Sequence, residues 1–81
     1  MDKRYVDSIH NINELEFAIF CIENVSTALE LEPETLYDAL TQKSDILYRY
    51  IVPNYEILHT QDKDYIVDDI IAVMKDAGVA I

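Results

Sequence analysis

The densest group of hydrogen-bonding side chains lies in the last third of the chain. Tyr55 and His59 are one helical turn apart, and Thr60, Tyr65 and Asp69 follow within ten residues. An imidazole titrates near neutral pH, so His59 beside a carboxylate and a tyrosine has the chemistry of an acid–base or small-ligand site. The other interpretation is structural, because Tyr55 and His59 can close a helix end by bonding to backbone groups at the turn into the last helix. We adopt the structural interpretation and keep the site as an alternative.

A second group of acidic side chains surrounds the start of the last apolar repeat, in Asp62-Lys63-Asp64 and Asp68-Asp69. Carboxylate oxygens are the ligands that hard divalent cations prefer. An EF-hand loop would need a glycine at its turn position and a glutamate at its twelfth position, and this stretch has neither. We expect a solvated acidic face, with favourable charges at a helix N-terminus, and no metal ion or other cofactor.

The charge balance argues against nucleic acid as a partner. Six Lys and Arg against 16 Asp and Glu give a net charge of −10, which opposes the phosphate attraction behind most nucleic-acid affinity. Residues 25–40 have the outline of a helix-turn-helix, but its second helix carries Glu34 and Asp38 where DNA contacts need Arg, Lys, Asn or Gln. Such a charge keeps a small domain soluble, and it favours a protein partner more basic than this chain.

Length and turn composition predict one small all-α domain. The chain has 81 residues with one Gly and two Pro, too few turn residues for a multi-strand sheet of this size. We expect a compact bundle of four to five short helices in residues 13–81, preceded by an N-terminal extension, 1–12. A domain this small has a thin core and little room for a deep active-site cavity, so we expect no enzymatic activity.

The lone cysteine and the absence of a long apolar run are typical of a cytoplasmic protein. Cys21 cannot form an internal disulfide, and it lies in the apolar run 17–22, where it is expected to be a buried small hydrophobe. The first residues lack the apolar region and cleavage site of a secretory leader. No stretch approaches the roughly 18 apolar residues of a membrane span.

The segment from Asn13 to about Leu29 is the predicted central helix. Asn13 is placed to cap it, with Glu16 three residues later as in a capping box. A helical wheel predicts an apolar face made of Leu15, Ala18, Ile19, Ile22, Val25 and Leu29, widened by Phe17, Cys21 and Ala28. Because most of the circumference is apolar, we expect neighbours on more than one side of this helix.

Prolines and small polar residues mark the boundaries of the middle segments. Pro33 suits the first position of a short helix, which we expect to end near Lys43. Ser44 or Asp45 can cap a third segment, and Pro53 is expected to break it because proline lacks a backbone N–H.

The last part of the chain predicts one or two helical turns around Tyr55 and Leu58, followed by a longer helix packed on the central one. Asp62 is placed to cap this last helix, and Gly78 is placed to stop it. Its expected apolar arc contains Ile66, Val67, Ile70, Val73, Met74 and Ala77.

Several short phrases occur in a characteristic order along the chain. They begin at Leu15, Phe20, Ile51, Leu58 and Tyr65, and they read LEF, FCIEN, IVPxY, LHTQ and YIVxDII. Together they resemble the bacterial domain-of-unknown-function 3791 family, whose members are small acidic helical proteins without an established activity. The resemblance covers about residues 13–79. Where members often have a glycine after LHTQ, this chain has Asp62, which suits a helix cap.

The resemblance implies a partner role more than a reaction. Members are often encoded close to genes for ADP-ribosyltransferase-like proteins, which implies an antitoxin or immunity-type function. The shared phrases carry over to a candidate partner-binding or structural motif of Glu23, Tyr55, His59, Thr60, Tyr65 and Asp69. We therefore expect a non-catalytic protein-interaction module. A small-ligand or enzymatic site around Tyr55, His59 and Asp69 stays open as the alternative, and so does a homo-oligomer.

Overall fold

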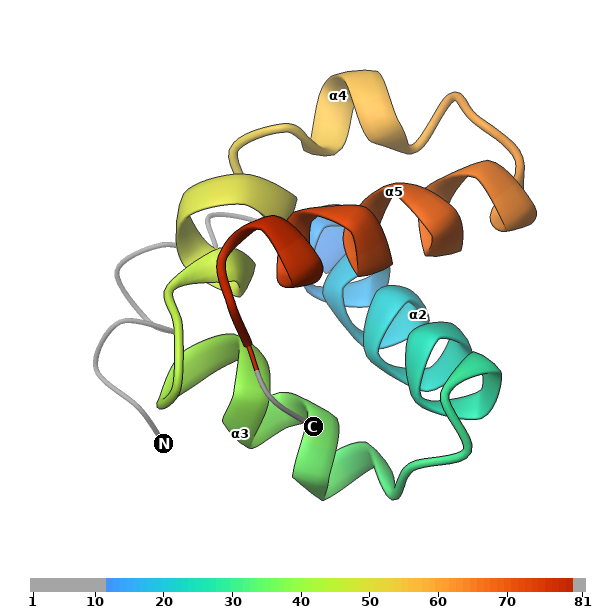
Figure 1. Cartoon of the computed structure of the whole chain (residues 1–81). Coiled ribbons are helices and arrows are strands. Elements are labelled where there is room, and N and C mark those ends of the chain that lie inside the picture. The colour runs from blue at the N-terminus through green and yellow to red at the C-terminus, as the bar shows by residue number, and fades with distance from the viewer. Residues whose placement is uncertain (1–11, 80–81) are drawn as a thin grey trace.

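The chain folds into helices joined by short turns (Figure 1). The computed structural model describes residues 12–79. Its elements are α2 (Ile12–Ala28), α3 (Pro33–Thr41), the π-helical turn η1 (Leu47–Ile51), α4 (Tyr55–Leu58) and α5 (Lys63–Asp76). These described residues contain helices and no strand, so the all-α prediction is confirmed. The predicted extension, 1–12, lies outside the described residues except for Ile12, the first residue of α2.

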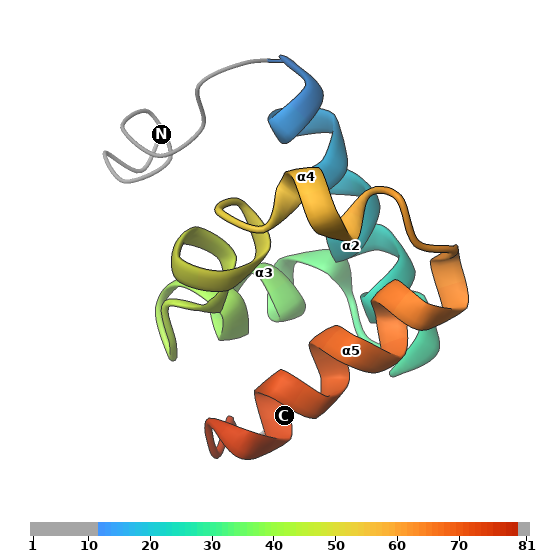
Figure 2. The same ribbon diagram turned by 90° about the horizontal axis from the view of Figure 1, so that it is seen from above.

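The central element is α2, as predicted. It packs against both α5 and α3, and α3 in turn contacts η1. Figures 1 and 2 show α3 and α5 as neighbours of α2, with α4 above them in the first view. One cluster of buried apolar side chains draws members from every element, among them Cys21, Leu36, Leu47, Leu58 and Ile70. The helices therefore share a single core.

The face of α2 that enters this core differs from the predicted one. The buried residues of α2 are Phe17, Ala18, Cys21, Val25 and Ser26. Ile19 was placed on the predicted apolar face but is 46% exposed, and Leu15 and Ile22 are only partly buried. A helix that is apolar around most of its circumference has more than one face that can pack. The approach of α3 and α5 selects the face that contains Cys21.

The predicted starts of α3 and α5 are confirmed. Pro33 is the first residue of α3. The carboxylate of Asp62 accepts a hydrogen bond from the backbone N–H of Tyr65 at 2.8 Å, which satisfies a donor at the start of α5. The capping box of Asn13 and Glu16 is wrong, because α2 already includes Ile12 and Asn13 lies inside its first turn.

The longest helices, α2 and α5, end in the same kind of turn. Gly78 has a φ of +71°, and the N–H of Val79 donates to the carbonyl of Met74 at 3.0 Å, so the predicted stop at Gly78 is confirmed. After α2 the corresponding position is Glu30, with a φ of +57°. This left-handed conformation costs a residue with a Cβ more than it costs glycine.

The predicted third segment is helical, but its geometry is unusual. In η1 the N–H of Val52 donates to the carbonyl of Leu47 at 3.0 Å, five residues earlier. The Ser44 hydroxyl accepts from the N–H of Ile46 at 3.4 Å and so pairs one donor at the start of the segment. Pro53 follows, and its missing N–H and its ring end the helix there. After it, α4 forms a single turn, within the predicted one or two.

Candidate functional site

Tyr55 and His59 lie at the two ends of α4 and stack on each other. Their ring centroids are 4.4 Å apart, and the ring planes are within 12° of parallel. Phe17 of α2 meets the Tyr55 ring edge-on at 5.4 Å, and Phe20 stacks beside Phe17 at 6.3 Å. Offset and edge-to-face pairs of this kind are favourable aromatic arrangements. The buried side of α2 thus anchors α4 and holds the Tyr55–His59 pair in place.

The hydrogen bonding of His59 fixes where its proton lies. Nδ1 is 2.7 Å from the backbone carbonyl oxygen of Tyr55. A carbonyl oxygen only accepts, so Nδ1 carries the hydrogen and donates it. In this tautomer Nε2 is the acceptor. The bond closes the end of α4 as the structural interpretation expects, while the ring itself stays exposed to solvent.

A groove of about 360 Å³ lies along this aromatic pair. Its lining combines ring faces with a few polar groups: Asn13, Glu16, Phe17, Phe20, Tyr55, His59, Gln61 and Ile66. Glu16 is exposed and supplies the negative charge among these residues. Asn13 and Gln61 add amide groups that donate and accept hydrogen bonds. The groove is therefore an aromatic surface with one carboxylate at its side.

Asp69 belongs to a different part of the molecule from this groove. Its carboxylate accepts a short hydrogen bond from the Tyr50 hydroxyl, and Asp69 is not among the residues that line the groove. The bond to Asp69, assisted by burial and by the negative charge of Asp69, raises the pKa of Tyr50 to about 12. Asp69 thus joins α5 to η1.

The other residues of the candidate motif are also separate from the groove. The side chain of Glu23 is exposed on α2. The Thr60 hydroxyl donates to the carbonyl of Ile57 at 2.7 Å, which is a local helix-end bond. Tyr65 is 53% exposed near the start of α5. Of the six candidates only Tyr55 and His59 line the groove, whereas Tyr65 and Asp69 both lie close enough to Tyr50 to raise its pKa.

Sequence reasoning missed the α2 side of the groove. Phe17 was assigned to packing, Phe20 to a shared phrase, and Asn13 and Glu16 to a cap. None was linked to His59, which lies about 40 residues further along the chain. The available signal was the pair of phenylalanines three residues apart, which must share one side of a helix. Nothing in a single sequence shows that α4 would dock there.

A second surface, the outward stripe of α2, consists of Ile12, Leu15, Ile19 and Ile22. Ile12 is 61% and Ile19 46% exposed, and the other two are partly buried. Their 3-4-3 spacing places them in one row along the helix. Glu16 and Glu23, both exposed, follow the second and fourth members directly and border the stripe on one side. Glu16 thus lies between the stripe and the groove.

A family model described as "Protein of unknown function (DUF3791)" matches residues 16–77. The chain belongs to the DUF3791 family. The suspected resemblance is therefore confirmed. The match contains the Tyr55–His59 pair, the Tyr50–Asp69 bond, and Ile19 and Ile22 of the outward stripe. No curated protein and no solved structure matches this DUF3791 chain.

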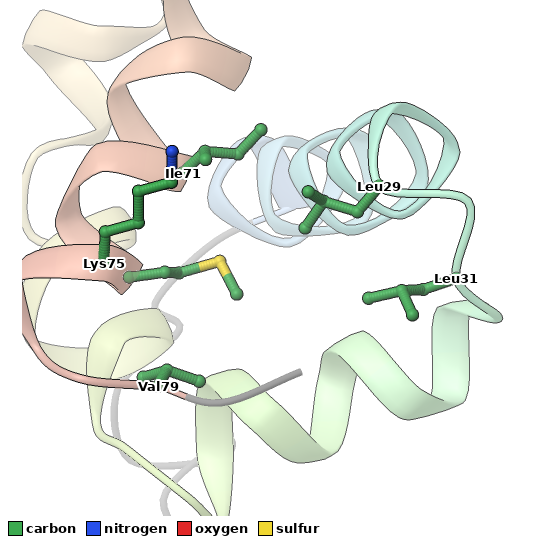
Figure 3. A pocket seen from close by; sticks show the side chains of 6 residues that line it. Leu29, Leu31, Ile71, Lys75 and Val79 are labelled. Atoms are coloured by element: carbon green, nitrogen blue, oxygen red, sulfur yellow. The ribbon is translucent and has the colours of Figure 1, made fainter.

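The DUF3791 domain also has an apolar cavity of about 270 Å³ near the C-terminal ends of α2 and α5 (Figure 3). Its lining is aliphatic except for one ammonium group: Leu29, Leu31, Ile71, Met74, Lys75 and Val79. Neither Tyr55 nor His59 lines it, and it contains no acid–base pair. This cavity is thus separate from the groove and lacks its polar chemistry.

The part of the domain that the structure describes contains neither a cluster of metal ligands nor a membrane-spanning helix. Within residues 12–79 no three or more His, Cys, Asp or Glu side chains gather closely enough to hold a metal ion. Over the same residues no helix is both long and apolar enough to cross a membrane. Cys21 is buried, and burial raises the pKa of its thiol to about 12, so it is protonated at neutral pH.

Proposed function

We propose that this DUF3791 domain is a non-catalytic protein-interaction module that binds a more basic protein through the outward stripe of α2. The observation that carries the proposal is the apolar row of Ile12, Leu15, Ile19 and Ile22 beside two carboxylates. Ile12 and Ile19 are exposed, and the other two are partly buried. Single exposed apolar residues are ordinary, but a contiguous apolar row with a polar border is typical of a binding surface. Its spacing fits an amphipathic helix laid along α2.

The charges next to the stripe favour a basic partner over a second copy of the chain. Glu16 and Glu23 lie along one edge, and the whole chain carries a net charge of −10. Two copies meeting through this stripe would bring like charges together. A partner with Lys or Arg beside its apolar residues would gain complementary pairs, faster association and specificity.

The chemistry of the titratable groups supports binding rather than catalysis. His59 bonds to a backbone carbonyl and not to a carboxylate, Asp69 is engaged by Tyr50, and Cys21 is a buried thiol. A general base needs a positioned partner and a site that excludes water. The exposed His59 ring has neither feature among the described residues.

The family resemblance supports a specific kind of partner. Because family members are often encoded beside ADP-ribosyltransferase-like proteins, we propose such a protein as the first candidate and an antitoxin or immunity-type role for the domain. In this role the stripe would dock on the enzyme and block it or hold it inactive.

The test is an affinity pull-down of the tagged chain from its native cell extract at low and at moderate salt, with mass spectrometry of the retained proteins. We expect a basic protein whose retention falls as salt rises. Ile19→Gln should abolish retention. Ile57→Gln is the matched control, because Ile57 is 67% exposed but lies on α4.

A retained protein that both variants bind equally would contradict the role of the stripe. If nothing is retained, the mass of the purified chain in solution tests self-association. A wild-type dimer that becomes a monomer in Ile19→Gln would mean that the stripe binds a second copy of the chain, and this would replace the proposal. A thermal-shift screen with wild type and His59→Ala tests the remaining alternative of a small ligand at Tyr55 and His59.

A further inference from the structure

The groove beside the outward stripe has a composition suited to one particular side chain. We infer that it receives an arginine side chain of the basic partner, an inference that rests on the proposed function. The groove contains aromatic rings from α2 and α4 and the carboxylate of Glu16. Glu16 also borders the stripe, so a helix bound along α2 passes directly beside the groove.

The aromatic part of the groove suits a flat cation. Phe20, Tyr55 and His59 line it, and the Tyr55 and His59 rings are stacked nearly parallel. The face of an aromatic ring carries negative charge density and attracts cations. A guanidinium is planar and weakly hydrated, so it stacks on such a face, whereas the ammonium of lysine is compact and strongly hydrated.

The polar part of the groove matches the many donors of a guanidinium. Glu16 offers two carboxylate oxygens, and Asn13 and Gln61 each offer an amide oxygen. In neutral His59 the Nδ1 hydrogen is used by the Tyr55 carbonyl, which leaves Nε2 to accept. An arginine has five N–H donors and no acceptor, so it can pair with several of these groups at once.

The surroundings of the groove favour a cation from outside the domain. No Lys or Arg of the described residues lines it, and Arg49 pairs with Asp45 rather than with Glu16. An anionic ligand would meet the Glu16 carboxylate and the excess of 16 acidic over six basic residues. An arginine side chain supplies the charge that the groove lacks.

The test adds each of three small probes to the full chain and measures binding by the changes in the chemical shifts of the backbone amides in NMR spectra. The probes are Nα-acetyl-arginine N-methylamide, its lysine counterpart and its citrulline counterpart, the last being a neutral mimic of arginine with nearly the same shape. We expect the arginine probe to shift the amide signals of Asn13, Glu16, Phe20, Tyr55, His59 and Gln61. The lysine probe should bind more weakly, and the citrulline probe should cause no shift.

Glu16→Gln should weaken binding of the arginine probe by about tenfold, the size expected for one hydrogen bond to a charged group. Glu23→Gln is the matched control, since Glu23 is an exposed carboxylate on the same helix that does not line the groove. The control should bind like wild type. Equal loss in both variants, shifts spread over the acidic surface, or equal binding of the lysine or citrulline probe would overturn the inference.

The two experiments test the groove and the stripe independently. If the arginine probe fails while Ile19→Gln still abolishes the pull-down, the groove inference is overturned and the interaction module stands. If the probe binds in the groove while Ile19→Gln retains its partner, the stripe is overturned and the groove remains an arginine site.

Discussion

The two apolar faces of α2 differ in how deeply they are buried. The inward face, with Phe17, Ala18, Cys21 and Val25, is at most 8% exposed. The outward stripe, with three isoleucines and a leucine, has members up to 61% exposed. Aliphatic isoleucine is at least as apolar as alanine or cysteine, so hydrophobicity alone would bury the outward stripe first. The difference shows that hydrophobicity alone does not decide which face of α2 is core, and that the packing of the neighbouring helices does.

A reason for this choice lies in side-chain size. Ala18 and Cys21 are small and let α3 and α5 approach α2 closely, and Phe17 fills the space under α4. Four branched aliphatic side chains in a row would hold a neighbouring helix further away. The inward face thus suits close packing within the chain, and the outward stripe is left for a partner.

The largest loss of stability is expected from a substitution on the inward face of α2. Phe17→Ala removes a nearly buried ring that packs on Tyr55 and Phe20, and it should lower the free energy of unfolding by about 3 kcal/mol or more. Urea unfolding followed by circular dichroism measures it. Phe17→Leu, which keeps most of the volume, should lose much less. A loss below about 1 kcal/mol for Phe17→Ala would mean that this face is not the core.

The next largest effect on stability is expected from the hydrogen bond that joins η1 to α5. The Tyr50 hydroxyl donates to Asp69, and this bond raises the pKa of Tyr50 from 10.0 to about 12. A pKa raised on folding contributes stability that is complete below the unfolded value. That stability is lost as pH rises through the folded value. Stability should therefore fall between about pH 10 and 12.

Tyr50→Phe is the matched variant for this alkaline loss. It should be less stable than wild type at neutral pH, and the gap should narrow as pH rises above about 10. The raised pKa of Cys21 gives a loss in the same direction, but both proteins contain Cys21, so their difference isolates Tyr50. Urea midpoints at pH 7, 9 and 11 measure it, and a constant gap would contradict the assigned bond.

A smaller effect is expected where α2 ends. Glu30 holds a φ of +57°, which glycine adopts at lower cost, so Glu30→Gly should raise the free energy of unfolding by about 0.5–1 kcal/mol. At the equivalent position after α5, Gly78→Ala should lower it by a similar amount. A Cβ there would have nothing within 4 Å, which leaves the backbone conformation as the cause. Thermal unfolding of both variants measures the two changes in stability. If both variants were more stable than wild type, or both less stable, the shared turn geometry would be contradicted.

The smallest effect on stability is expected on the outward stripe. Ile19→Gln replaces an isoleucine that is 46% exposed with a good helix former, so the unfolding free energy should change by less than about 0.5 kcal/mol. Unfolding in urea beside Ile57→Gln measures it. A loss as large as that of Phe17→Ala would show that the stripe is part of the core and not a partner surface.

Local signals of the sequence predicted the fold well. One glycine and two prolines indicated helices throughout, Pro33 and Asp62 marked two helix starts, and Gly78 marked a helix end. These signals depend on the φ restriction of proline, on a carboxylate close to the free N–H groups of its own helix, and on a residue without a Cβ. Each acts within a few residues, so a single sequence contains it.

The candidate site was only partly predictable, because its contacts join distant segments. Tyr55 and His59 share one helical turn, and the sequence placed them together. Asp69 was grouped with them by closeness in the chain, yet it bonds to Tyr50. The groove needs Glu16 and Phe20 from α2, and no local pattern links that helix to α4.

The sequence by itself determined the helical class, most helix boundaries, the acidic charge and the family. These properties follow from residue composition and from interactions within one or two helical turns. Only the tertiary structure decided that Ile19 faces away from the core, that Tyr55 docks on Phe17, and that Glu16 lies between stripe and groove. The physical reason is that α2 has two apolar faces that can each pack, and the approach of α3 and α5 to the face with small side chains decides between them.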